Sequence, residues 1–216
     1  MLPMQASWGR SSILLELEID ADERNAGNAP PMAKERTAML LMRRVVTGQT
    51  SDDRHIYTHV EEVAPLEMGG GAKWYPIWGW EQMPTLPFCP KGPYEPNSVF
   101  PRPGGMRINT VTFPPGFGAK GVLPPIPPNP EYKKLASAVV SGGEHDYDTG
   151  MHSTDSIDLG LVLSGEMTLI QGDGSEQTLK RGDVLIQNGA MHAWKNRGSE
   201  PCTICFVLLG TPRGKS

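Results

Sequence analysis

The stretch MHSTDSIDLGLVLSGEM, residues 151–167, carries the pattern that decides the fold. From Ile157 onward, large aliphatic residues alternate with smaller or polar ones, which is typical of a β-strand with one buried face. One face carries Ile157, Leu159, Leu161 and Leu163, and the other carries Asp158, Gly160, Val162 and Ser164. The small residues leave room beside a carboxylate, so the pattern favours a site at Asp158 inside a barrel. A capping or turn role for Asp158 at the strand entrance is the structural alternative.

Short strand-like runs separated by turns indicate the architecture of the rest of the sequence. The most regular series of expected strands covers residues 156–163, 166–171, 176–180, 183–187, 192–196 and 202–210, and four earlier ones cover 43–48, 54–63, 72–80 and 106–113. Residues 131–140 are the one expected helix. Short strands with glycine turns at this spacing predict an antiparallel sandwich or barrel. We therefore expect an all-β fold with at most one or two short helices.

Two motifs lie within this series of strands. The first has His152, Thr154, Asp158 and Gly165 at positions where a known motif reads H-x-H, then Glu after three or four residues, then Gly after six more. The second has Gly189, His192 and Asn196 in the pattern G-x-x-H-x-x-x-N, with Gln187 where a proline is usual. Two such motifs in this order make residues 105–210 resemble the cupin superfamily.

The resemblance implies a cupin barrel, which is a double-stranded β-helix or jelly-roll. It is similar to the small single-domain cupins of bacteria and fungi. We expect a single cupin domain over residues 43–216, preceded by an N-terminal extension over residues 1–42. Fourteen of the 21 prolines fall in residues 84–130, so this segment is expected to run as loop or extended chain that covers the barrel.

The resemblance also implies a metal site at His152, Asp158 and His192. Metal-binding cupins typically use three histidines and a glutamate, whereas here Thr154 replaces one histidine and Asp158 replaces the glutamate. Two imidazoles and one carboxylate can hold divalent iron, zinc, manganese or nickel and leave positions open for water or substrate. His145 could act as a replacement ligand. A cupin that has lost its metal and uses both histidines as pocket residues is the alternative.

Other residues are candidates for catalysis and for the pocket wall. Asp158 or His145 could move a proton. Arg107, if it points inward, could bind a substrate carboxylate through two hydrogen bonds, and a surface position at a strand start is its alternative. The remaining expected pocket residues are Thr154, Gln187 and Trp194.

Composition excludes several classes of partner. The net charge of −4 and the isoelectric point near 5.7 leave no basic surface for nucleic acid. No window reaches eighteen consecutive apolar residues, and the run SSILLELEI is short and holds two glutamates, so we expect neither a membrane span nor a signal peptide. Three cysteines cannot form a closed disulfide framework, which predicts buried thiols in the cytoplasm. A redox CxxC pair at Cys202 and Cys205 is the alternative.

Three functions agree with these residues. The first is a metal-dependent lyase or isomerase that decarboxylates, dehydrates or cyclises a small oxygenated or polyketide-like acid, an activity that the resemblance places in secondary metabolism. Its metal would act as a Lewis acid. The second is an Fe(II) dioxygenase on the same ligands, and the third is a metabolite-binding module without catalysis. We rank the first ahead of the other two.

The apolar face of the opening strand predicts a homodimer. Burying each of its four aliphatic side chains is worth roughly 1.5–3 kcal/mol, and a contiguous exposed patch of this kind would be adhesive. Residues 11–19 or the tryptophan-rich residues 72–80 could cover the patch, from the same chain or from a partner. The resemblance implies pairing of this kind.

Overall fold

The computed structural model describes residues 42–121, 126–138, 145–146 and 149–214. The chain divides into residues 1–39 and residues 40–216, and the description below concerns the second unit. The predicted extension over residues 1–42 falls outside the described residues except for Met42, so it stays a prediction. No helix in the described part of the chain is long and apolar enough to cross a membrane.

The described fold is nearly all-β, as predicted. Its strands are β1 (Met42–Gln49), β2 (His55–Val63), β3 (Leu66–Gly69), β4 (Ala72–Trp80), β5 (Met106–Phe113), β6 (His145–Asp146), β7 (Met151–His152), β8 (Ser156–Ser164), β9 (Glu166–Gln171), β10 (Glu176–Lys180), β11 (Val184–Asn188), β12 (His192–Lys195) and β13 (Cys202–Gly210). The one helix among the described residues is α1 (Pro130–Ser137). Ten of the described strands lie where the sequence predicts them, and β3, β6 and β7 were not predicted. β6 and β7 have two residues each, which are too few to establish an alternation.

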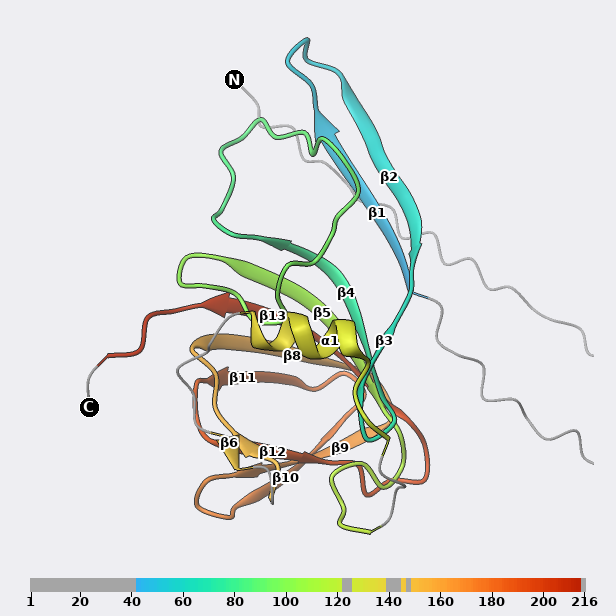
Figure 1. Cartoon of the computed structure of the whole chain (residues 1–216), viewed down its shortest axis with the longest axis vertical. Helices are drawn as coiled ribbons and strands as arrows, with labels where there is room; N and C mark the ends of the chain where they lie inside the picture. The colour runs from blue at the N-terminus through green and yellow to red at the C-terminus, as the bar shows by residue number, and fades with distance from the viewer. Residues whose placement is uncertain (1–41, 122–125, 139–144, 147–148, 215–216) are drawn as a thin grey trace, which may run out of the picture. The chain divides into compact units, whose positions relative to one another are not determined.

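The strands form two large sheets and a separate hairpin (Figure 1). One sheet has the order β11-β8-β13-β5-β4-β3, the second has the order β10-β9-β12-β7-β6, and β1 pairs only with β2. All the pairs are antiparallel. Strand β8, which carries Asp158 of the first motif, lies inside the first sheet between β11 and β13, while the second motif supplies β12 of the other sheet. The two motifs therefore contribute to both sheets.

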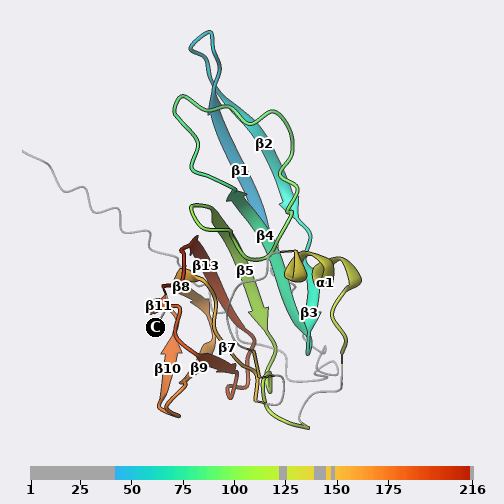
Figure 2. The same ribbon diagram turned by 60° about the vertical axis from the view of Figure 1, so that its left-hand side comes forward.

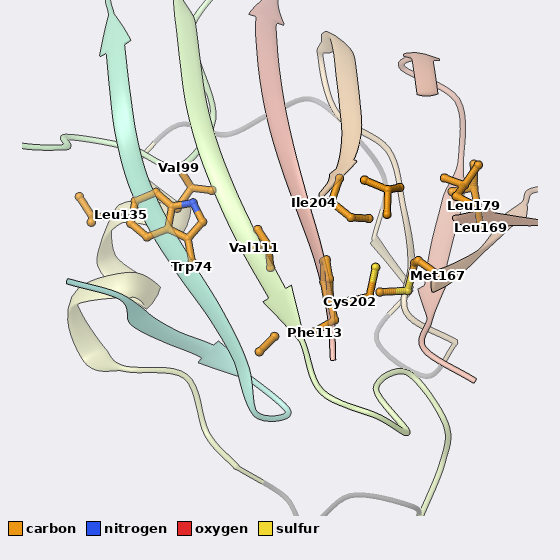
Figure 3. Close-up of a cluster of buried hydrophobic side chains, with 12 residues drawn as sticks. Trp74, Val99, Val111, Phe113, Leu135, Met167, Leu169, Leu179, Cys202 and Ile204 are labelled. Atoms are coloured by element: carbon orange, nitrogen blue, oxygen red, sulfur yellow. The ribbon is translucent and has the colours of Figure 1, made fainter. Parts of the chain in front are cut away.

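The hydrophobic core lies between these layers (Figure 3). It joins residues of both large sheets to residues of α1 and of the proline-rich segment: Ala72, Trp74, Val99, Val111, Phe113, Leu135, Val162, Met167, Leu169, Leu179, Cys202 and Ile204. The helix lies beside β3 (Figure 2), and Tyr132 of α1 contacts Trp74 edge to face, with 5.5 Å between the ring centroids. The helix begins after Asn129, whose side chain accepts a hydrogen bond from the backbone N–H of Glu131.

The alternation predicted for β8 is present. Ser156, Asp158, Gly160 and Val162 are buried, and the aliphatic residues between them are exposed. The outer face of the sheet carries these exposed side chains together with others from β11 and β13, namely Ile157, Leu159, Leu161, Leu163, Val184, Ile186 and Leu209, each 37–59% exposed. Cross-strand pairs such as Leu161 with Val184 make this outer apolar face continuous.

The cysteine pair of β13 does not form a redox site. Both Cys202 and Cys205 are free thiols, and three-residue spacing on a strand places them on opposite faces. Burial raises the pKa of both thiols, that of Cys202 to about 12. A thiol that stays protonated is a poor nucleophile, so the alternative of a CxxC redox centre is wrong.

Candidate functional site

The centre of the candidate site is a pair of histidines on neighbouring strands. His152 of β7 and His192 of β12 are direct cross-strand partners, and their ring centroids lie 4.4 Å apart. In each ring Nδ1 lies within hydrogen-bonding distance of the carbonyl two residues earlier, 3.0 Å from Gly150 O and 2.8 Å from Ala190 O. Because a carbonyl can only accept, each Nδ1 carries a proton, and a ring that is neutral in this arrangement keeps its lone pair on Nε2.

Burial keeps His192 neutral at physiological pH. The residue is only 3% exposed. Loss of solvation, followed by the nearby ring of His152, lowers the pKa of His192 to about 4, while the carbonyl of Ala190 acts in the opposite direction. The indole of Trp194 stands edge-on to the imidazole at 5.6 Å. The imidazole of His192 is therefore uncharged, is oriented by its bond to Ala190 O, and can accept a hydrogen bond beside the indole of Trp194.

Asp158 is a buried carboxyl on the inner face of β8. Ser156 Oγ lies 2.5 Å from Oδ1, and Thr154 Oγ1 donates more weakly to Oδ2 at 3.4 Å. Burial raises the pKa of Asp158, and the two hydroxyl groups oppose this shift. The inward direction predicted for Asp158 is confirmed, so the alternative of an exposed turn residue is wrong.

Gln187 connects the surroundings of Asp158 to the histidine pair. It is the cross-strand partner of Asp158 and is itself buried. Its Nε2 donates to Ala190 O at 3.1 Å, and the same carbonyl accepts from Nδ1 of His192. A carbonyl has two lone pairs and can accept both bonds. Asp158 and His192 lie on different sheets, and Gln187 is the residue that pairs with the strand of the first and bonds to the carbonyl that holds the second.

The predicted metal set is only partly assembled by the described residues. No three described His, Cys, Asp or Glu side chains form a group that could hold a metal ion. The two histidines fit a divalent metal in their donor chemistry, because imidazole nitrogen is a common ligand of such ions. The backbone of His145 in β6 pairs directly with that of His152, so His145, His152 and His192 occupy one row across β6, β7 and β12. The side chain of His145 lies outside the described residues.

Arg107 is held by its own chain rather than placed beside the histidines. It is 1% exposed, so the alternative of a surface arginine is wrong. Its guanidinium donates to three backbone carbonyls and three side chains, which belong to Trp80, Glu81, Asn97, Ser98 and Met106. It borders a pocket of about 410 Å³ formed with the end of β4 and with segment 88–97. The carboxylate-binding role predicted for Arg107 would require one of these contacts to break.

Comparison with known proteins gives the family of the region that contains this site. Residues 139–208 match Cupin_2, described as a cupin domain. Residues 139–208 are a cupin domain. The match contains His152, Asp158 and His192, so the family resemblance predicted from the two motifs is confirmed for this part of the chain.

The chain is similar over short stretches to several fungal proteins. It is 53% identical over 47 residues to "Phomopsin biosynthesis cluster protein C'" of Diaporthe leptostromiformis, covering 22% of this chain and 25% of that protein. It is 39% identical over 62 residues to "Cupin-domain-containing oxidoreductase srdB" of Neurospora crassa, covering 28% and 32%. These matches span only a quarter to a third of the relatives' own length. Among solved structures, the cupin domain of Schizosaccharomyces pombe Cnp3 aligns with TM-score 0.41 and 11% identity over 78% of this chain and 87% of that one.

Sequence reasoning missed three contributors to the cupin site. Ser156 lies two residues before Asp158 on the same face of β8, so the period of two could have identified it. The carbonyl of Ala190 has no signature in a side-chain pattern. Arg213, which donates to Thr154 O and Gly189 O, comes from beyond the last strand, and only the tertiary structure brings it to the motifs.

Proposed function

We propose that the cupin domain catalyses a proton-transfer reaction of the lyase or isomerase class on a small oxygenated acid. The observations that support the proposal most are the buried carboxyl of Asp158 and the buried, neutral imidazole of His192. Gln187 lies between them, as the cross-strand partner of Asp158 and as a donor to the carbonyl that also binds His192. Environments that raise the pKa of an acid and lower that of a base are typical of acid–base sites.

In this proposal Asp158 acts as the general base. Its carboxylate would accept a proton from the carbon beside a substrate carbonyl, and the electron pair left behind would form the carbon–carbon double bond of an enolate. Decarboxylation, dehydration and isomerisation of oxygenated acids all pass through such a species. The hydroxyl groups of Ser156 and Thr154 orient the carboxylate, and Gln187 holds the carbonyl that fixes the tautomer of His192.

The proposal includes a divalent metal held by His152 and His192. The sequence predicts Asp158 both as a metal ligand and as a proton carrier, and here it acts only as the base. The third ligand position goes to His145, because His145 lies in register with the two histidines. When bound, the ion would supply Lewis-acid stabilisation of a substrate oxygen. The choice among iron, zinc, manganese and nickel follows from elemental analysis of the purified full chain.

Secondary metabolism is the proposed context. Several relatives carry names of biosynthesis clusters, such as "Oryzines biosynthesis cluster protein J" of Aspergillus oryzae, with 40% identity over 55 residues. These are names of other proteins, and the matched stretch is short. They support a small-molecule biosynthetic substrate rather than a macromolecular one.

An oxidoreductase is the second candidate, and the names of other relatives favour it. "Cupin-domain-containing oxidoreductase virC" of Hypocrea virens is 37% identical over 62 residues. An Fe(II) dioxygenase would use the same histidines but would require oxygen. A metabolite-binding module without catalysis would show neither proton exchange nor oxygen consumption.

One experiment separates the candidates. The purified full chain is incubated in D2O with a panel of small β-keto and hydroxy acids, with and without oxygen, and carbon-bound deuterium is followed by NMR. We expect exchange that persists without oxygen and is lost in Asp158→Asn. Oxygen consumption with a strict requirement for iron would instead establish the dioxygenase. Binding without either reaction would establish the binding module.

A further inference from the structure

We propose that Arg213 is a positioning residue that holds the two cupin motifs in register at the histidine pair. It follows β13, outside both motifs and outside the matched region 139–208. This role concerns the same site as the proposed function. The contacts of Arg213 do not depend on which reaction the site catalyses.

The guanidinium of Arg213 contacts both motifs at once. Its Nη2 donates to Thr154 O at 2.9 Å, in the first motif, and to Gly189 O at 3.3 Å, in the second. Its Nε donates to the carboxylate of Asp155 at 2.6 Å. A planar fork can serve two carbonyls and a carboxylate together, which a lysine ammonium cannot do in the same geometry.

The β8–β11 ladder holds one side of this junction and ends at the pair Ile157 and Asn188, whereas the β7–β12 ladder on the other side fixes it weakly. β7 and β12 are paired at one position only, His152 with His192. Residues 153–155 and 189–191, which connect this pair to the rest of each motif, lie outside the strands. A ladder of one residue pair permits slippage, so the register depends on contacts beyond it.

The neighbouring contacts point to the same junction. The backbone N–H of Thr211 donates to Asp155 O at 3.0 Å, which lays the C-terminal segment across the first motif. A Cβ at Gly189 would lie 3.1 Å from Thr154 O and 3.4 Å from Nη2 of Arg213. The two motifs therefore approach each other closely at the point where Arg213 bridges them.

The charge of Arg213 is the smaller part of its effect. Its side chain is 45% exposed and that of Asp155 is 21% exposed, and ion pairs at such positions contribute little in water. The bridge between two carbonyls is what links the motifs. Without this bridge, Thr154 could move relative to Gly189.

The test is NMR of the histidine ring protons in the full chain. The ring protons of His152 and His192 report how closely the two tilted rings approach, because each lies in the ring current of its neighbour. We expect Arg213→Ala to abolish this mutual shift and to speed backbone hydrogen exchange in residues 188–192. Arg213→Lys, which keeps the charge, should give a partial loss.

The matched control is Arg197→Ala. Arg197 is a half-exposed arginine paired through two nitrogens with Glu176, away from the histidines. It should leave the ring shifts of both histidines unchanged. Unchanged shifts in both Arg213 variants, or equal changes in the Arg197 variant, would overturn the proposal. If Arg213→Ala does not fold, Arg213→Lys decides the question on its own.

A second arm separates the bridge from the ion pair. Asp155→Asn removes the charge partner of Arg213 and leaves both carbonyls in place. We expect ring shifts close to those of the unmodified chain, and a loss as large as in Arg213→Ala would overturn the carbonyl bridge as the cause. None of these measurements needs a substrate, so absence of catalysis would refute the proposed function without affecting this test.

Discussion

His152 and His192 are cross-strand partners whose rings lie 4.4 Å apart, and each imidazole donates Nδ1–H to the carbonyl two residues before it. The same local arrangement is thus built twice, once in each motif. In the neutral ring of His192 it leaves the lone pair on Nε2. Two adjacent imidazoles of this kind favour a divalent cation as their ligand.

The low pKa of His192 predicts a loss of stability in mild acid. The folded value is about 4 and the ordinary value is 6.5, so between these pH values the unfolded chain binds the proton more readily. The free energy of unfolding should therefore fall as the pH drops from 6.5 to about 4, by about 3 kcal/mol. Urea denaturation at a series of pH values measures this. His192→Gln should remove that part of the slope, and His55→Gln, at an exposed site on β2, should retain it.

Replacing Asp158 should stabilise the fold while it removes activity. Burial raises the pKa of Asp158, so its charge opposes folding at neutral pH and Asp158→Asn should raise the free energy of unfolding. The gain should shrink as the pH falls, because the carboxyl of the unmodified chain then becomes neutral too. Asp173→Asn is the contrasting variant, since hydrogen bonds from Ser175 lower the pKa of Asp173 and no gain is expected. A less stable Asp158→Asn at neutral pH would contradict the prediction.

Gly189 should not tolerate a side chain. Its φ of +62° disfavours L-residues by about 1–2 kcal/mol, and an added Cβ would also meet Thr154 O at 3.1 Å. Gly189→Ala should therefore destabilise more than Gly174→Ala, which has a φ of +83° but nothing within 4 Å of the added Cβ. Chemical denaturation of both variants compares them. Equal losses would mean that the junction between the motifs can relax.

His145 should matter for metal content. The proposed metal set places it in register with His152 and His192, so His145→Ala should reduce bound metal at least ~10-fold, the scale of a lost supporting or direct ligand. His55→Ala is the control, because His55 is an exposed histidine in the β1–β2 hairpin. Elemental analysis of the purified proteins gives the result. Full metal content in His145→Ala would remove His145 from the set and return the third position to Asp158.

We propose that the outer apolar face of the six-stranded sheet forms a two-fold homodimer interface. Its exposed aliphatic side chains cross three adjacent strands, an arrangement that favours association over exposure to water. Leu161→Glu, opposite Val184 and Cys205, should give a monomer by light scattering. Thr178→Glu, on the exposed part of β10, should not.

The contribution of the N-terminal region to this dimer is a separate question. A chain that starts at Arg43 tests it by the same method. A dimer that persists after truncation would place the interface entirely within the described residues. A monomeric mass for the unmodified full chain at micromolar concentration would refute the interface.

The sequence by itself determined the class of fold and the direction of most side chains on the long strands. Strict alternation along β8 placed Asp158 inward and Leu159 outward, because a strand turns successive residues to opposite faces whatever lies around it. The spacing of the two motifs identified His152 and His192 before their strands could be paired. These features are local, and local periodicity can be read directly from the order of residues.

Only the tertiary structure decided which of these residues meet. The row from His145 to His192 depends on the register of three short strands, and β6 and β7 are too short to show a period. Arg107 was predicted at a site and instead binds acceptors of its own chain, because the segment before β5 folds back over it. Arg213 reaches Thr154 across 59 positions of sequence. Such contacts arise from the packing of distant segments, and no pattern within one segment encodes them.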